Sequence, residues 1–243
     1  MRLKSIIAAL SAALVIAFSA ASVRAYEVEP LIFDLAPFGR AASQTILVNN
    51  TQQVPIVFEV VAERRFIDEF GEETREDAVD DFLIIPPQAR VEPGESQQIR
   101  VRYIGRPDIT ESQHYALTVR QVPLEELQES GVQVLVNFAA SVQVVPPRAA
   151  AALQVASAEI SADEDGTPVA RFRLENLGNR YQGLARSTIT LASGGQEMVL
   201  EGESLNRALR HTLVPGGGAR WGYVELPDGW PTSGPLDVRV DLP

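Results

Sequence analysis

The sequence of 243 residues lacks cysteine and contains one lysine and two histidines. Without cysteine, the chain cannot form a disulfide scaffold, a thiolate metal site or a cysteine nucleophile. No pair of histidines stands four residues apart, no Gly-x-Ser-x-Gly elbow is present, and no glycine-rich phosphate loop opens a helix. We therefore expect a protein that is not an enzyme and that uses no metal or other cofactor.

Positive charge is also scarce, with 21 basic against 32 acidic side chains and a net charge of −11. Affinity for nucleic acid comes mainly from clustered Lys and Arg, so this balance argues against a nucleic-acid partner. The apolar fraction of 45% and the charged fraction of 22% are typical of a globular protein with a sizeable core.

The first 25 residues have the pattern of a secretory signal peptide. Arg2 and Lys4 precede an apolar run from Ile6 to Ala20, and Val23-Arg24-Ala25 fits a cleavage site. The run is too short to span the roughly 30 Å hydrocarbon layer comfortably, so we expect no membrane insertion. Cleavage after export would leave a mature chain with a net charge of −14 that contains arginine but no lysine.

From Tyr26 onward, short runs alternate between apolar and polar residues, and helical periodicity is almost absent. Runs of this kind separated by Asn, Gly, Pro or Asp are typical of β-sandwiches. The predicted strands include Thr45–Val48, Ile56–Val61, Gln98–Tyr103, Ala116–Arg120, Val155–Ile160, Val169–Leu174, Arg186–Leu191, Trp221–Val224 and Leu236–Val240. Because Pro146 and Pro147 cannot continue a ladder, we predict two domains, residues 26–147 and 148–243.

The most informative predicted strand runs from Val132 to Val145. Its even-numbered residues are all apolar, whereas polar residues predominate at odd positions. A strand of this length would measure about 46 Å, roughly twice the usual length. Part of it should overshoot its own sandwich and leave an open edge, which is a template for pairing with another chain.

Two other segments need separate interpretation. Residues 63–81 hold nine acids interspersed with three arginines, and we expect a solvated loop or short helix there, with a cation site or partner contact as the alternative. Residues 163–166 are predicted to form a hairpin turn, because the remaining ligands of a calcium loop are missing. The aromatic group Trp221, Tyr223 and Trp230 is expected in the core or at a corner.

Several short motifs stand in a consistent order over residues 27–180. They are Ile85-Pro86-Pro87, Val91–Glu95 with the strand 98–103 after it, Arg106–Ile109, Tyr115–Pro123, and Phe172–Asn176 with Tyr181 following. In this order and spacing they resemble the periplasmic pilus-assembly chaperones of the chaperone-usher pathway, the PapD-like superfamily. The resemblance implies an all-β protein of two immunoglobulin-like sandwiches in an L or boomerang shape.

The resemblance also assigns a role to the long strand. In the family, alternate apolar residues of this strand fill the groove of an incomplete pilin subunit. By position these residues are Val132, Val134 and Val136, with Phe138 as a fourth. The assignment agrees with the physics of strand addition, in which main-chain hydrogen bonds give affinity and alternate side chains give specificity.

One family feature is missing from this chain. Family members hold the terminal carboxylate of the pilin with an Arg of the first strand and a Lys late in the long strand. Those positions fall at Phe33 or Asp34 and at Ser141 or Gln143, none of which is basic. The candidates for a substitute anchor are Arg100, Arg102, Arg120 and Arg148.

The resemblance therefore predicts a divergent periplasmic chaperone that binds pilus or fimbrial subunits, folds them and delivers them to an outer-membrane usher without ATP. Self-association of the free protein would cover the open strand. Two alternatives from other classes are a structural or adhesive component of a surface fibre, and a ligand-binding sandwich module. The first would need a donor arm near Tyr26, and the second a cluster of exposed aromatic residues.

Overall fold

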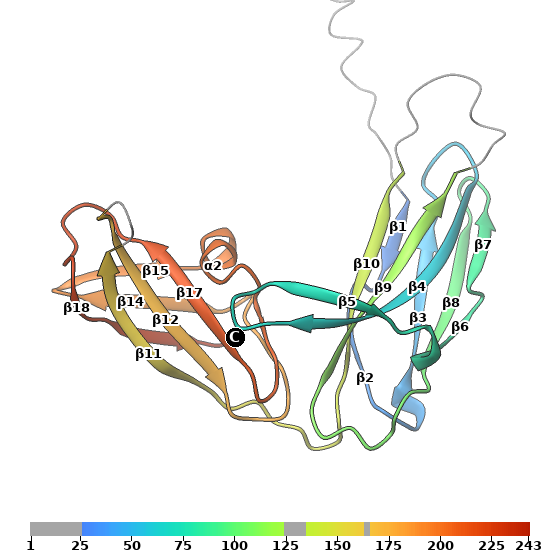
Figure 1. The fold of residues 1–243 in the computed structure, drawn as a ribbon. Coiled ribbons are helices and arrows are strands. Elements are labelled where there is room, and N and C mark those ends of the chain that lie inside the picture. The colour runs from blue at the N-terminus through green and yellow to red at the C-terminus, as the bar shows by residue number, and fades with distance from the viewer. Residues whose placement is uncertain (1–25, 124–134, 163–165) are drawn as a thin grey trace, which may run out of the picture.

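The computed structural model describes residues 26–123, 135–162 and 166–243, so the predicted signal peptide lies outside the described residues. Two β-sandwiches are joined at an angle and give the molecule the shape of an L (Figure 1). The prediction of an all-β protein built from two such sandwiches is confirmed. Within the described ranges, no helix is long and apolar enough to cross a membrane.

The first sandwich has two sheets. One has the order β1-β3-β8-β6 and consists of β1 (Glu27–Glu29), β3 (Ser43–Asn49), β8 (Ser96–Tyr103) and β6 (Phe82–Ile85). The other has the order β2-β10-β9-β4-β5, with β7 also paired to β4, and consists of β2 (Ile32–Leu35), β10 (Asn137–Val144), β9 (Gln113–Val122), β4 (Ile56–Ile67), β5 (Glu73–Asp77) and β7 (Gln88–Val91). Short 3₁₀ turns, η1 (Arg40–Ala42) and η2 (Val79–Asp81), connect strands.

The second sandwich is smaller. One sheet has the order β17-β12-β11-β18, with β11 (Leu153–Ala162), β12 (Pro168–Asn176), β17 (Ala219–Glu225) and β18 (Gly234–Pro235). The facing sheet has the order β15-β14-β19, with β14 (Thr188–Ser193), β15 (Gln196–Leu200) and β19 (Asp237–Asp241). A short ladder joins β13 (Gln182–Gly183) to β16 (Leu213–Val214), and helix α2 (Gly202–Leu209) follows β15.

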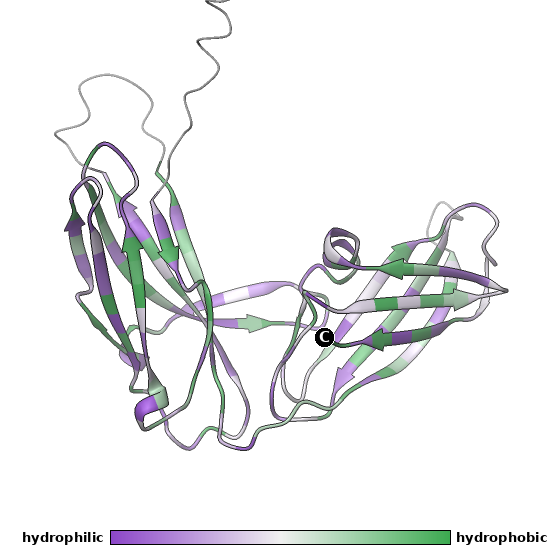
Figure 2. Ribbon diagram, turned by 180° about the vertical axis from the view of Figure 1, so that it is seen from behind, coloured by the Kyte–Doolittle hydropathy of each residue, from purple (hydrophilic) through white to green (hydrophobic). Residues whose placement is uncertain are grey.

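Alternation along the strands builds both cores. In β8 the side chains of Ile99, Val101 and Tyr103 are buried, whereas the intervening arginines are exposed. In β12, Ala170 and Phe172 are buried in the same way. The alternation is visible as hydrophobic and hydrophilic bands along the strands in Figure 2. Because successive side chains of a strand point to opposite faces, the sequence pattern alone places these residues.

The acidic segment 63–81 differs from its prediction. It is neither a loop nor a helix over most of its length, because β4 continues to Ile67 and pairs with β5 in a long hairpin. Asp68 closes the turn, since its Oδ1 accepts hydrogen bonds from the backbone N–H groups of Phe70 (2.9 Å) and Glu72 (2.8 Å). Gly71 has a φ of +86°, a conformation that side chains other than glycine rarely adopt.

The tip of the β4–β5 hairpin docks on the second sandwich (Figure 1). The Glu69 carbonyl accepts a hydrogen bond from Trp221 N–H of β17 at 2.7 Å, so the hairpin begins to pair with the edge of that sheet. The buried Arg220 donates to the Asp68 carbonyl at 2.6 Å. Arg173 forms an ion pair with the Glu69 carboxylate at 3.1 Å. The hairpin tip thus contacts the second domain of the same chain, and the alternative interpretation of this acidic segment, a cation site or partner contact, stays a prediction.

A second set of contacts joins the domains near the connecting chain. Asp34 of β2 accepts hydrogen bonds from Tyr181 Oη (2.8 Å) and Arg180 (2.6 Å). Ser112 N–H donates to the Asn179 carbonyl at 3.0 Å, and the Asn179 side chain donates to the Thr110 carbonyl at 3.0 Å. The two sandwiches are thus tied together at two separate places.

Candidate functional site

Strand β10 has an edge that is open along part of its length. On one side β9 pairs with all of it, from Asn137 to Val144. On the other side β2 pairs only with its second half, where Ser141 N–H donates to the Leu31 carbonyl at 2.7 Å. Backbone direction alternates along a strand, so Ala139 and Asn137 direct their N–H and C=O groups toward the same side as Ser141. No described strand pairs with β10 there.

The even-numbered side chains of β10 face the core of the first sandwich. Ala140, Val142 and Val144 are buried, as the predicted alternation requires. Phe138 is half-buried, and its ring meets the Tyr26 ring edge to face, with 4.9 Å between the centroids. Within the described chain, the strand predicted over residues 132–145 is confirmed only as β10, residues 137–144.

The predicted binding row is therefore only partly described. Val132 and Val134 lie outside the described residues. Val136 is half-buried, packs against the first core, and accepts a hydrogen bond on its carbonyl from Tyr26 Oη at 2.7 Å. Tyr26 thereby fixes the chain just before β10, and residues 26–29 are part of the first sandwich rather than a free arm.

The odd-numbered side chains of β10 face the inner corner of the L. Ser141 Oγ accepts hydrogen bonds from Arg65 Nη1 (2.9 Å) and from Gln143 Nε2 (2.8 Å). Gln143 Oε1 lies 2.6 Å from Nδ1 of the buried His114. A hydroxyl has one proton and two acceptor sites, so Ser141 keeps its own O–H free to donate.

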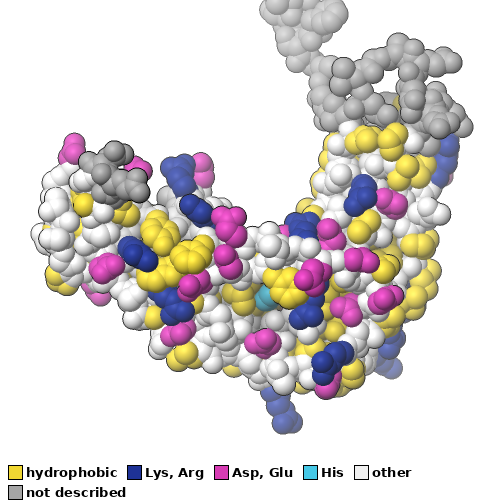
Figure 3. Space-filling model, in the orientation of Figure 1, with side chains coloured by type: hydrophobic (Ala, Val, Ile, Leu, Met, Phe, Trp, Pro, Cys, Tyr) yellow, Lys and Arg dark blue, Asp and Glu magenta, His cyan; other side chains and the backbone are white. Residues whose placement is uncertain are grey.

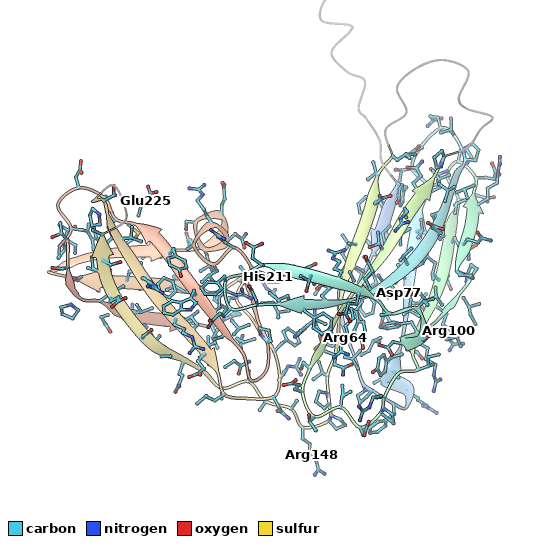
Figure 4. The ribbon with its side chains drawn as sticks, in the orientation of Figure 1. Arg64, Asp77, Arg100, Arg148, His211 and Glu225 are labelled. Atoms are coloured by element: carbon cyan, nitrogen blue, oxygen red, sulfur yellow. The ribbon has the colours of Figure 1, made fainter. Side chains whose placement is uncertain are left out.

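Beside Ser141 lies a cavity of about 280 Å³ between the two domains. Its wall includes Arg65 of β4, Arg75 of β5, Ser141 of β10, and Tyr181 and His211 of the second sandwich. Figure 4 shows His211 beside the β4–β5 hairpin. On the face shown in Figure 3, acidic and basic side chains are interspersed over the junction of the two domains.

The arginines beside the cavity are paired with Glu73. Its Oε2 accepts hydrogen bonds from Arg65 Nε (2.9 Å) and Nη2 (2.5 Å), and its Oε1 accepts one from Arg75 Nε at 2.6 Å. Burial alone would raise the pKa of Glu73, but the hydrogen bonds and charges of both arginines outweigh it and lower the pKa to about 2. Burial, together with the charges of Arg65 and Arg220, lowers the pKa of His211 to about 4. At neutral pH, Glu73 is therefore ionised and His211 uncharged.

The structure places the predicted anchor positions next to one another. Asp34 pairs in register with Gln143, and Phe33 with Val142, on adjoining strands β2 and β10. Asp34 is engaged by the second domain. A cation does reach this position, but it comes from Arg65 of β4, which sequence reasoning missed because the predicted strand ended at Val61.

The four arginines predicted as substitute anchors do not line this cavity. Arg100 and Arg102 are on β8 of the other sheet, and Figure 4 shows Arg100 on the side of the first sandwich away from the second. Arg120 pairs with Glu59 at 3.3 Å on the surface. Arg148 lies in the connecting chain at the outer corner and points away from the molecule (Figure 4).

The remaining chemistry-bearing residues have structural partners. Trp230 is buried in the second core, whereas Trp221 and Tyr223 flank Arg171, whose Cζ lies 4.4 Å from the Trp221 ring centroid. No group of three or more His, Cys, Asp or Glu side chains able to hold a metal occurs in the described part of the chain. The segment predicted as a turn, 163–166, lies outside the described residues except for Gly166.

Solved structures with the same arrangement are numerous. One is a chain of the CsuC-CsuE complex, which joins a chaperone and a tip adhesion subunit of archaic chaperone-usher pili from Acinetobacter baumannii. Its TM-score is 0.57 at 11% identity, and the match covers 89% of this chain and 98% of that chain. The class 5 fimbriae chaperone CfaA has a TM-score of 0.55 and 12% identity, and the match covers 90% of this chain and 100% of CfaA. A chain of the Salmonella enterica complex of SafA pilin and SafB chaperone has a TM-score of 0.55 and 14% identity. That match covers 91% of this chain and 98% of the other.

At these identities the likeness shows the fold, which is that of the two-domain PapD-like chaperones. The match in sequence concerns the first sandwich and the start of the connecting chain. Residues 38–150 match the family described as pili and flagellar-assembly chaperone, PapD N-terminal domain. No curated protein sequence matches the chain significantly.

Proposed function

We propose that this protein is a periplasmic, non-enzymatic chaperone that binds pilus or fimbrial subunits, folds them and delivers them to an outer-membrane usher by donor-strand complementation. The observation that carries the proposal is the open edge of β10, where Asn137 and Ala139 direct backbone groups toward a side on which no strand of the described residues pairs. An incomplete subunit sandwich can add its edge strand to this row of donors and acceptors.

The side chains that enter the subunit are those of Val132, Val134 and Val136. Burial of three valines at about 1.5–3 kcal/mol each offers roughly 5–9 kcal/mol before the costs of association. The row passes into the chaperone's own core between Val136, which is half-buried against that core and offers only its exposed part to the subunit, and Phe138, whose ring is held by Tyr26. Release requires no ATP, since an arm of the next subunit replaces the strand at the usher. In the free protein, a second copy covers the same edge.

Periplasmic co-expression with a pilin-like subunit tests the proposal. Val134→Arg with Val136→Arg should abolish recovery of the subunit with the chaperone, because two charges cannot enter an apolar groove without a large desolvation cost. Val79→Arg is the matched control, since Val79 is 58% exposed in η2 and away from β10. Equal recovery by the double variant and the control contradicts the proposal.

The terminal carboxylate of the subunit is held, in this proposal, by the Ser141 hydroxyl with the Arg65 guanidinium behind it. Arg65 Nη1 lies 2.9 Å from Ser141 Oγ and polarises the hydroxyl, so the pair replaces the lysine of other family members. Deletion of one hydrogen bond to a charged group costs about 1.5–3 kcal/mol, so Ser141→Ala should weaken subunit binding by roughly tenfold or more. A subunit extended beyond its natural C-terminus should be insensitive to this substitution. If Ser141→Ala weakens binding of the natural and the extended subunit equally, the carboxylate is anchored elsewhere.

A further inference from the structure

The arginine pair of the cleft already holds a carboxylate from its own chain. Glu73 lies between Arg65 and Arg75 and accepts three hydrogen bonds of 2.5–2.9 Å from them. The Arg65 and Glu73 side chains are only 11% and 19% exposed, so solvent screens this contact weakly. Arg75 also pairs with Glu63 at 3.2 Å. The two guanidinium charges beside the cavity are thus matched by two carboxylates.

The N–H groups of Arg65 show what remains for a ligand. The Nε and Nη2 side of the guanidinium faces Glu73, and Nη2 also lies 2.9 Å from His211 Nε2. Nη1 donates to Ser141, which leaves one N–H of Nη1 and the Ser141 hydroxyl as donors toward the cavity. The donors of a carboxylate site are present, but the charge that would attract a carboxylate is neutralised in place.

We propose that Glu73 is a resident competitor that keeps small free carboxylates out of the cleft, so that a carboxylate binds there only when its owner also adds a strand along β10. The inference rests on the proposed function for the identity of that strand. Its physical basis is that the ligand and Glu73 repel each other across the Arg65 guanidinium. A lone carboxylate cannot offset this repulsion, whereas a ligand with main-chain hydrogen bonds to Ala139 and Asn137 can.

Titration calorimetry on the full mature chain tests the inference with N-acetyl-alanylalanine, which has a free carboxylate, and with its C-terminal amide. Glu73→Gln should bind the free acid at least fivefold more tightly than the wild type. Glu72→Gln is the matched control, because Glu72 is in the same hairpin and pairs with Arg210 at 3.1 Å, away from the arginine pair. It should bind like the wild type, and the amide should bind none of the three proteins measurably.

Equal affinity of wild type and Glu73→Gln for the free acid overturns the inference. Weaker binding by Glu73→Gln also overturns it, because Glu73 would then position Arg65 rather than compete with a ligand. If Glu73→Gln does not fold, Glu73→Asp, which withdraws the carboxylate by one methylene, should still bind the acid more tightly than the wild type. Failure of the wild type to recover any subunit refutes the proposed function alone, since the dipeptide result does not depend on it.

Discussion

The ion cluster at Glu73 predicts a specific loss of stability in acid. The pKa of this carboxyl is 4.5 in the unfolded chain and about 2 in the folded protein, where Arg65 and Arg75 hold the charged form. A carboxyl with a lowered folded pKa stabilises the protein above its unfolded pKa, and the contribution is lost as the pH falls toward the folded value. Glu73→Gln removes this contribution and leaves the shape of the side chain unchanged.

The same difference in pKa sets the contribution of ionised Glu73 to the free energy of unfolding. It corresponds to at most about 3 kcal/mol. Because Arg75, the second partner of Glu73, is 39% exposed and its contribution is screened by solvent, we take about half of this value. Glu73→Gln should therefore lower the free energy of unfolding by about 1.5 kcal/mol at pH 6. At pH 3, where more than half of the linkage is gone, the loss should be about 1 kcal/mol smaller.

Urea unfolding followed by tryptophan fluorescence measures the effect, since Trp221 and Trp230 both belong to the second sandwich that the hairpin contacts. Glu72→Gln is again the control. Its partner Arg210 is 65% exposed, and exposed ion pairs contribute less than about 1 kcal/mol. A difference between wild type and Glu73→Gln that is the same at pH 3 and pH 6 would refute the reasoning.

Three further predictions concern the strand edge and the hairpin. Tyr26→Phe should lower the free energy of unfolding by about 1–2 kcal/mol and reduce subunit recovery, because it releases the carbonyls that the hydroxyl holds at 2.7 and 3.0 Å; unchanged unfolding and recovery would contradict it. Ala139→Pro should leave the fold intact but abolish subunit recovery, since the lost N–H faces the open edge, whereas Ala140→Pro should cost about 3 kcal/mol by breaking the ladder with β9. Circular dichroism measures the stability of the two proline variants, and co-purification measures their recovery of the subunit. Equal results for both variants would show that the backbone alternation is misassigned. Gly71→Ala should cost about 1–3 kcal/mol, because φ is +86° and the new Cβ would lie 2.9 Å from Arg210 Cβ; an unchanged radius of gyration in X-ray scattering and unchanged stability would argue against a docked hairpin tip.

Much of the fold could be predicted from the sequence because period-2 alternation is local. Residues such as Ile99, Val101 and Phe172 are buried where the pattern places them. The hairpin strand β5 could not be found this way. Its residues Glu73–Asp77 are all polar, since it is the exposed edge of its sheet. Its ion-pair partners are on β4, and the hairpin tip before it contacts arginines of the other domain, which no local pattern reveals.

The candidate site shows the same limit. The register of the family resemblance correctly brought Asp34, Gln143 and Ser141 to one place. The cation at that place comes from Arg65 of β4. That strand was expected to end at Val61, four residues before Arg65. Segments from both domains that are far apart in the sequence line this cavity, and only tertiary packing brings them together. No sequence feature ranked the four candidate arginines, and all of them lie on other surfaces.

The docked hairpin has a consequence for the geometry of the whole molecule. The second sandwich is held at the connecting chain, at His211 beside Arg65, and at Trp221 and Arg220 beside the hairpin tip, so contacts along the hairpin fix its orientation. The opening of the L is then set by how far the hairpin reaches beyond its own sheet. The length of the stretch from Ile67 to Glu73 therefore sets the angle between the domains. Residues inserted or deleted there would change that angle without altering either core.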